Sequence, residues 1–131
     1  MKREWKGSLT VETAYLMPLV CLLLAAGLLL MFYFHDKAVI SACAYETAVI
    51  GSTKAREKDG VEEEVLRQAF RERIRGKCIL FPGAEPGIEI RDTQIVVTAE
   101  AARRGIRLTV VQTAALTEPE ERIRSVRRIT G

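Results

Sequence analysis

The feature that most constrains this chain is an uncharged run near its N-terminus. It covers residues 13–34, and none of these 22 residues is Asp, Glu, Lys or Arg. As an α-helix the run would be roughly 33 Å long at about 1.5 Å per residue, and the hydrocarbon core of a bilayer needs about 20 such residues. The sequence therefore predicts one membrane-spanning helix, and we place the transmembrane segment at residues 8–34.

Basic residues on one side of the run predict its orientation. Lys2, Arg3 and Lys6 precede it, whereas only one Lys or Arg lies within the ten residues that follow it. By the positive-inside rule, this asymmetry puts the N-terminus in the cytoplasm and residues 35–131 outside it. The sequence thus predicts a single-pass protein of the cytoplasmic membrane, with a cytoplasmic leader at residues 1–7.

Two other N-terminal signals fit less well. A secretory signal peptide has a shorter apolar region that ends at an Ala-x-Ala cleavage site, and no such site directly follows the apolar run. Residues 40–43 look like a lipoprotein box with a lipidated cysteine. However, His35, Asp36 and Lys37 separate this box from the apolar run, whereas the two should be contiguous. We therefore expect the run to remain in the protein as a membrane anchor.

Residues 6–12, Lys-Gly-Ser-Leu-Thr-Val-Glu, resemble the processing site of type IV pilin-like proteins. In that family a short basic leader ends in Gly, a membrane-embedded aspartic peptidase cuts after this Gly, and the fifth residue of the mature chain is Glu. A cut after Gly7 would make Ser8 the first residue here and Glu12 the fifth. The resemblance implies that Gly7 and Ser8 form the processing site.

The position of a proline narrows this resemblance. Pro18 lies six residues after Glu12, and Ser8 is a small residue where type IV pilins commonly have an aromatic residue or Met. Both features look more like the TadE-like minor pilins (pseudopilins) of tight-adherence pilus systems, over about residues 6–34. The resemblance implies a prepilin peptidase substrate that functions in pilus assembly. Its implied partners are the membrane, the peptidase, other pilin subunits, a secretion platform and a secretion ATPase.

Glu12 and Pro18 each have two interpretations. A carboxylate at the edge of an apolar span is costly and marks a functional position. In pilin-like proteins it pairs with the N-terminal amine of a neighbouring subunit, here that of Ser8; in the simpler interpretation Glu12 faces lipid headgroups. Pro18 cannot donate a hydrogen bond to the Ala14 carbonyl, which favours a local kink or loosening. The resemblance implies that such a feature helps the helices to pack in a filament or to leave the bilayer. Prolines are also tolerated in membrane helices without such a role.

The part outside the membrane begins with helical periodicity. The apolar pattern of residues 36–50 predicts that the span continues as one long helix, which Gly51, Ser52 and Thr53 would interrupt. A second helix is predicted over residues 61–74. Its apolar face would consist of Val61, Val65, Leu66, Ala69, Phe70 and Ile74.

The ends of this second helix carry the charges that a helix dipole favours. Residues 62–64 are three glutamates in its first turn, and Gly76 provides a C-terminal stop. The glutamates could also suggest calcium binding. A calcium loop needs spaced Asp or Asn ligands, and none accompany these glutamates, so a role at the helix terminus is favoured.

Beyond Gly76 the apolar period changes from 3.6 to 2, which is typical of strands. Three antiparallel strands are predicted, around residues 88–90, 94–102 and 106–111, with turns at residues 92–93 and 103–105. The predicted inner faces consist of Ile95, Val97, Ala99 and Ala101 on the second strand, and of Ile106, Leu108 and Val110 on the third. A sheet of this size needs helices to cover one face.

The C-terminus is predicted to be a short helix. Thr117 and Glu120 form a capping box, and Ile123, Val126 and Ile129 recur at helical spacing among arginines. The fold class is therefore α+β: a transmembrane helix that extends into a long helix, a second helix, a small three-stranded antiparallel sheet and a short C-terminal helix. Residues 35–131 would form one extracytoplasmic domain, because 97 residues suffice for one small domain.

The three cysteines have different expected environments. Cys21 lies in the span and should be unpaired. Cys43 and Cys78 would both lie outside the cytoplasm, where disulfides can persist, so a Cys43–Cys78 disulfide is a candidate. The alternative is that both are small buried residues with free thiols.

Several function classes have little raw material in this chain. The net charge of +3 is too small, and too interleaved with acids, to indicate nucleic-acid binding. One histidine and three cysteines without CxxC spacing provide no metal site, and no nucleophile–base set or phosphate loop indicates an enzyme or a cofactor.

Two functions are consistent with the sequence. The first is a TadE-like pseudopilin that is cut after Gly7 and used in pilus assembly, ending in the membrane or in an extracellular filament. The second is an uncut, signal-anchored membrane protein whose outer domain binds a partner. The N-terminus of the mature protein distinguishes them.

Overall fold

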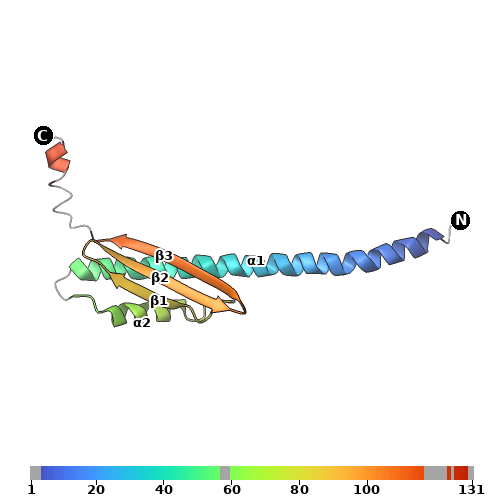
Figure 1. Cartoon of the computed structure of the whole chain (residues 1–131), viewed down its shortest axis with the longest axis horizontal. Helices are drawn as coiled ribbons and strands as arrows, with labels where there is room; N and C mark the ends of the chain where they lie inside the picture. Colours follow the sequence, from blue (N-terminus) through green and yellow to red (C-terminus); the bar gives the residue numbers. More distant parts are fainter. Residues whose placement is uncertain (1–3, 57–59, 117–123, 125, 130–131) are drawn as a thin grey trace. The chain divides into compact units, whose positions relative to one another are not determined.

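The computed structural model describes residues 4–56, 60–116, 124 and 126–129. Its elements are α1 (Glu4–Arg56), α2 (Glu63–Ile74), β1 (Glu85–Ile90), β2 (Gln94–Arg103) and β3 (Ile106–Ala115). Residues 124 and 126–129 are also helical. This is the predicted α+β fold, with a long N-terminal helix, a second helix, three strands and a short C-terminal helix (Figure 1). The predicted capping box at Thr117 and Glu120 lies outside the described residues.

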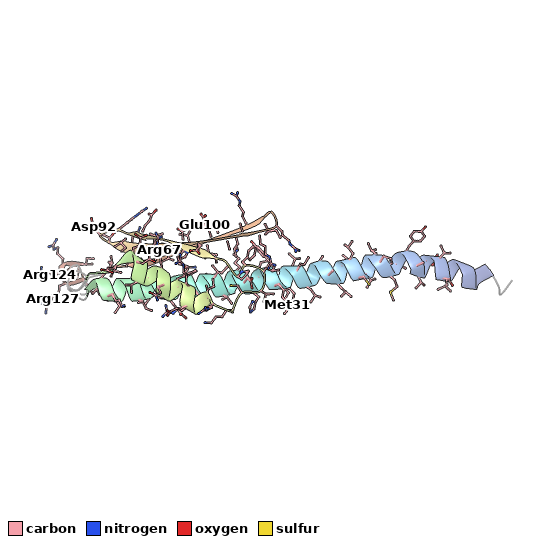
Figure 2. The ribbon with its side chains drawn as sticks, turned by 90° about the horizontal axis from the view of Figure 1, so that it is seen from below. Met31, Arg67, Asp92, Glu100, Arg124 and Arg127 are labelled. Atoms are coloured by element: carbon pink, nitrogen blue, oxygen red, sulfur yellow. The ribbon has the colours of Figure 1, made fainter. Side chains whose placement is uncertain are left out.

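The chain divides into two compact units, Met1–Phe34 and His35–Gly131. In the first unit, α1 is apolar on all sides and its large side chains are exposed; for example, Leu22, Leu24 and Met31 are each more than 60% exposed. Figure 2 shows side chains projecting from every side of this part of α1. A helix that is hydrophobic all round must be covered by protein or by lipid, and this one is long and apolar enough to cross a membrane.

In the second unit, α1 continues without a break to Arg56. The predicted interruption at Gly51, Ser52 and Thr53 is therefore wrong. The hydroxyls of Ser52 and Thr53 donate to the Val49 carbonyl, at 2.8 and 2.9 Å, which is compatible with a continuous helix. These polar residues lie inside α1 because tertiary packing overrides their local preference for turns.

Gly51 has a packing role instead. It is buried, and a Cβ atom at this position would lie 2.9 Å from Cδ1 of Ile95 and 3.0 Å from Cδ1 of Leu66. The absence of a side chain therefore allows α1 to approach both α2 and β2 closely.

The second helix begins at Glu63, two residues later than predicted, and buries three of the six residues of its predicted face; Val61 and Ala69 are half-buried. Leu66, Phe70 and Ile74 are buried, whereas Val65 is 43% exposed, contrary to prediction. Val65 lies one position before Leu66, and therefore about 100° around the helix from it, so both cannot face the core centre. The helix ends as predicted, because Gly76 adopts a left-handed φ of +73°.

The sheet has the order β1-β2-β3, with antiparallel pairing throughout. All four predicted inner residues of β2 are buried, as are Leu108 and Val110 of β3, but Ile106 beside the turn is 52% exposed. Arg104 and Gly105 form a two-residue turn with φ of +49° and +82°, as type I′ hairpins require. The other predicted turn is closed by Arg91 and Gln94, which exchange backbone hydrogen bonds of 2.9 and 3.3 Å.

The two helices cover the inner face of the sheet. On this face the core contains Ile40, Ala44 and Ala48 of α1, Leu66 and Phe70 of α2, and Ile95 and Val97 of β2, all at most 1% exposed. At β3, Gln112 Nε2 donates to Ser41 Oγ of α1 at 2.8 Å. Figure 1 shows α2 alongside β1. The second unit thus has its own core, to which α1 contributes one wall.

Candidate processing and assembly site

The predicted processing site lies in the first turns of α1. Gly7 and Ser8 are both helical, three and four residues after the helix begins at Glu4. The first four N–H groups of a helix lack intrahelical partners, and helix ends fray, so this backbone is readily unwound. Gly7 is exposed, and a Cβ added there would meet no atom within 4 Å. A larger residue at position 7 is therefore compatible with the fold of this chain.

Glu12 lies one turn after Ser8 on α1, and its side chain is exposed. Within the part of the chain that the structure describes, no basic side chain forms an ion pair with it. A carboxylate at the edge of an apolar span is expensive unless a cation or water satisfies it. Glu12 is thus available to a group outside this chain.

Pro18 lies inside α1, and the helix is continuous through it. The N-terminal, blue part of α1 curves gently in Figure 1 and has no sharp kink. Loss of one N–H donor is compatible with a helix that stays intact at this position.

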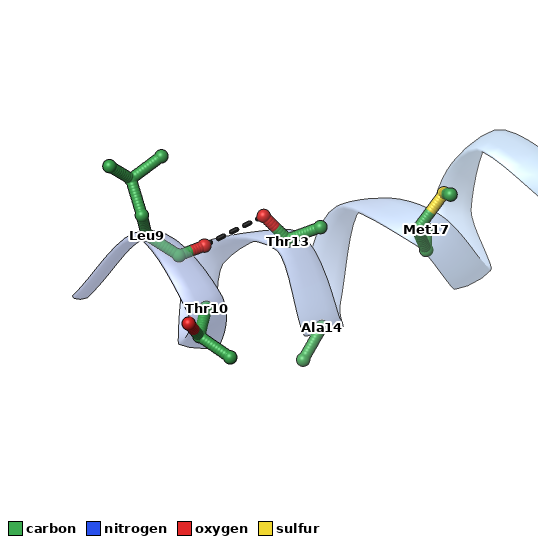
Figure 3. Close-up of a pocket in the computed structure, with 5 residues that line it drawn as sticks. All are labelled: Leu9, Thr10, Thr13, Ala14 and Met17. Carbon is green, nitrogen blue, oxygen red and sulfur yellow. Dashed lines mark hydrogen bonds between the residues drawn. The ribbon is translucent and has the colours of Figure 1, made fainter. Parts of the chain in front are cut away.

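A feature that the sequence reasoning did not identify is a shallow, open recess on α1, between the processing site and Pro18. It is lined by Leu9, Thr10, Thr13, Ala14 and Met17 (Figure 3). The Thr13 hydroxyl donates to the Leu9 carbonyl at 2.7 Å, which turns its polar atom back onto the helix. The recess thus consists of three small residues, Thr10, Thr13 and Ala14, flanked by the larger Leu9 and Met17.

The sequence reasoning also missed Asp36, which it treated only as a flanking charge. Asp36 is 0% exposed. Its carboxylate accepts N–H groups from Ile79 at 2.9 and 3.0 Å, Leu80 at 2.6 Å and Phe81 at 2.9 Å. We call this set of bonds the Asp36 anchor. His35 Nδ1 lies 3.2 Å from the same carboxylate.

The electrostatics of the Asp36 anchor favour the charged carboxylate. Burial alone would raise the pKa of Asp36, but the N–H bonds from Ile79, Phe81 and Leu80, together with His35, lower it below its ordinary value. Successive backbone N–H groups that converge on one anion form a concave binding site. The anchor fastens the turn at residues 79–81 to α1, two residues after the uncharged run ends. The only sequence signal for this role was an acidic residue, Asp36, two residues after the end of the uncharged run.

The three cysteines are free thiols in this structure. Cys21 is exposed on the apolar part of α1, Cys43 is buried, and Cys78 is half-buried between α2 and β1. The predicted Cys43–Cys78 disulfide stays a prediction. Among the described residues, no group of three His, Cys, Asp or Glu side chains could hold a metal ion.

Comparison with known proteins gives one match. Residues 7–49 match the family model described as TadE-like protein. No curated protein and no solved structure matches the chain. The matched region begins at Gly7 and includes Ser8, Glu12, Pro18 and Asp36, and it ends within α1. TadE-like proteins are a pilin-like structural family and not an enzyme family, associated with the membrane and with pilus components. The resemblance to TadE-like proteins that the sequence shows is thereby confirmed for residues 7–49, about a third of the chain.

Proposed function

We propose that this chain is a TadE-like pseudopilin, inserted with its N-terminus in the cytoplasm, cut after Gly7 and used in pilus assembly. One observation carries the proposal: the family match begins at Gly7 and covers the apolar helix that follows it. The charge asymmetry around residues 13–34 supports this orientation. The chain is then the substrate of a prepilin peptidase, and the chemistry belongs to the peptidase.

Processing would change the charge of the N-terminal segment. Hydrolysis of the Gly7–Ser8 peptide bond removes the three basic leader residues and creates an amine at Ser8. At neutral pH much of this amine is protonated, because an α-amino group has a pKa of about 7.7–8.0. The charge lies at the edge of the span, where an unpaired ion is costly. The exposed carboxylate of Glu12 on a neighbouring subunit is the partner that we assign to it.

The recess on α1 offers a second feature for helix packing, on a different face of the helix from Glu12. Thr10, Thr13 and Ala14 give this face a low profile between Ser8 and Pro18. Within residues 35–131, the Asp36 anchor fastens the turn at residues 79–81 to the continuing part of α1.

Substitutions at two positions test the proposal, because cutting and assembly depend on different residues. Gly7→Val leaves α1 unhindered, but a branched residue would obstruct the peptidase, so the leader should remain attached. Glu12→Ala should be cut normally, but its neighbour's amine would lack a partner in an apolar bundle, where an unpaired charge costs several kcal/mol. This variant should be processed, stay in the membrane and be absent from sheared filaments.

The measurement is a mass spectrum of the N-terminal peptide in membrane and sheared extracellular fractions, for wild type and both variants. A host that lacks the prepilin peptidase serves as the control for cutting. Glu100→Ala, at an exposed acid on β2, is the control for Glu12→Ala and should assemble normally. If the wild-type protein keeps its leader in a host with an active peptidase, the pseudopilin proposal fails, and the uncut anchor with a partner-binding domain replaces it.

A further inference from the structure

Two contacts hold the end of α2 and the segment that follows it against α1. They lie on either side of Cys43 and Cys78. Toward the end of α2, Arg73 Nε lies 3.4 Å from Oε2 of Glu46 on α1. Further along the segment, the Asp36 anchor binds residues 79–81. Cys43 lies between Asp36 and Glu46 on α1, and Cys78 lies between Arg73 and residues 79–81. Because the two segments run antiparallel, both thiols lie between the Arg73–Glu46 contact and the Asp36 anchor.

The environments of the two thiols agree with this placement. Cys43 is 4% exposed and Cys78 is half-buried. Burial raises the pKa of Cys78 to about 11, with smaller contributions from the negative charges of Asp36 and Cys43. Burial and Glu46 also raise the pKa of Cys43, while Lys77 and Arg73 act against them.

We propose that Cys43 and Cys78 form an intramolecular disulfide that joins the segment after α2 to α1. The inference depends on residues 35–131 lying outside the cytoplasm, as in the proposed function, but not on cutting or on pilus assembly. The cross-link would close a loop that contains all of α2. It restricts the unfolded chain and keeps the turn at residues 79–81 next to Asp36.

The chemistry is a thiol–disulfide exchange in two steps. The more accessible thiolate of Cys78 attacks a sulfur of a disulfide donor, such as an extracytoplasmic thiol–disulfide oxidoreductase. One donor sulfur leaves as a thiolate and takes up a proton. The thiolate of Cys43 then attacks the Cys78 sulfur and expels the second donor sulfur. In total the two cysteines lose two protons and two electrons, and the donor disulfide is reduced to two thiols.

The test counts free thiols in the full chain made in a host that exports it. Cys21→Ala removes the cysteine of the apolar helix, so only the pair remains. Membranes are quenched in acid, denatured and treated with N-ethylmaleimide, and the intact mass is measured with and without prior reduction. We expect no alkyl groups before reduction and two after it. The control, Cys21→Ala with Cys43→Ala, should carry one alkyl group before and after.

Two outcomes would overturn the proposal: two alkyl groups on the unreduced Cys21→Ala chain, or a covalent dimer through Cys78 as the main oxidised form. The same intact mass shows whether the leader is present, so failure of the disulfide and failure of processing are read separately. A chain with its leader and a disulfide would refute only processing.

A second measurement tests the thiol assignments in purified, reduced full-length Cys21→Ala protein in detergent. With oxidised glutathione as the donor, the rate of pairing should rise about tenfold per pH unit between about pH 7 and 9, because the thiolate fraction of Cys78 rises in this way below its pKa. The paired form should unfold roughly 10 °C above the reduced form. A stable mixed disulfide with glutathione at Cys78, without closure to Cys43, would contradict the proposed geometry.

Discussion

At the scale of single residues, two carboxylates on α1 have opposite environments. Asp36 is completely buried and is bonded by three consecutive backbone N–H groups. Glu12 is exposed, and no described basic side chain pairs with it. A buried charge persists only where hydrogen bonds or ions compensate its lost hydration. The chain itself satisfies Asp36, so its role is structural, whereas the partner that we propose for Glu12 belongs to a neighbouring subunit.

Replacement of Asp36 should destabilise the second unit, residues 35–131. Asp36→Asn keeps the shape of the side chain but removes the charge and leaves at least one of the three N–H donors without an acceptor. We expect the free energy of unfolding to fall by roughly 2–4 kcal/mol. Urea unfolding followed by circular dichroism in mild detergent measures the change. Glu100→Gln, at an exposed acid on β2, is the control and should change stability by less than about 0.5 kcal/mol.

The Asp36 anchor should also make stability depend on pH in the acid range. The pKa of Asp36 is lowered in the folded state, so the unfolded chain binds the proton more readily. The stabilisation is fully present above the unfolded value of about 3.9 and is lost as the pH falls through the lower folded value. The stability difference between wild type and Asp36→Asn should therefore be constant from about pH 5 to 7 and shrink below about pH 4. A difference that is unchanged down to pH 2 would contradict the anchor.

At the scale of secondary-structure elements, α1 determines how the second unit packs. It provides Ile40, Ala44 and Ala48 to the core, each 0% exposed. At Gly51 it approaches β2 and α2 so closely that a Cβ atom would lie within 3.0 Å of side chains on both. Interiors are packed nearly as densely as organic crystals, so added atoms at this crossing must displace Ile95 and Leu66.

A residue larger than Gly51 at this crossing should destabilise the fold, even though most residues favour a helix more than glycine does. Gly51→Val should lower the free energy of unfolding by about 1–3 kcal/mol, which is typical of overpacked cores. Thermal unfolding monitored by circular dichroism tests this. Gly83→Val is the matched control, because a Cβ atom there meets nothing within 4 Å, and its melting temperature should stay close to that of the wild type. Equal effects of both substitutions would rule out the packing explanation.

The same elements explain how much the sequence could predict. The second helix and the alternating strands could be predicted because each buries a periodic face, and periodicity depends only on neighbouring positions. The apolar run could be predicted from its length and its lack of charge. Gly51 was mistaken for a helix break, because its role depends on Ile95 and Leu66, which are close only in the fold. The Asp36 anchor joins positions more than 40 residues apart through backbone N–H groups, and such groups have no side-chain pattern in the sequence.

At the scale of the whole molecule, the two units differ in how far their apolar side chains are exposed. In the first, Met1–Phe34, most of the described large apolar side chains are exposed, and the helix is long and apolar enough to cross a membrane. The second, His35–Gly131, encloses Ile40, Phe70 and Val97 at 0% exposure. It contains both halves of the Asp36 anchor, since Asp36 and residues 79–81 all belong to it.

Residues 35–131 should therefore fold when produced without the first unit. We expect a soluble, monomeric fragment whose circular dichroism shows both helix and strand and whose thermal unfolding is cooperative. Because the anchor lies within this fragment, Asp36→Ala should lower its melting temperature by more than about 8 °C, as expected for a loss of 2 kcal/mol or more in a domain of this size. A purely helical spectrum would contradict the independent sheet. If the wild-type fragment aggregates, and folds only when residues 8–34 are restored, then the second unit needs the apolar part of α1 to fold.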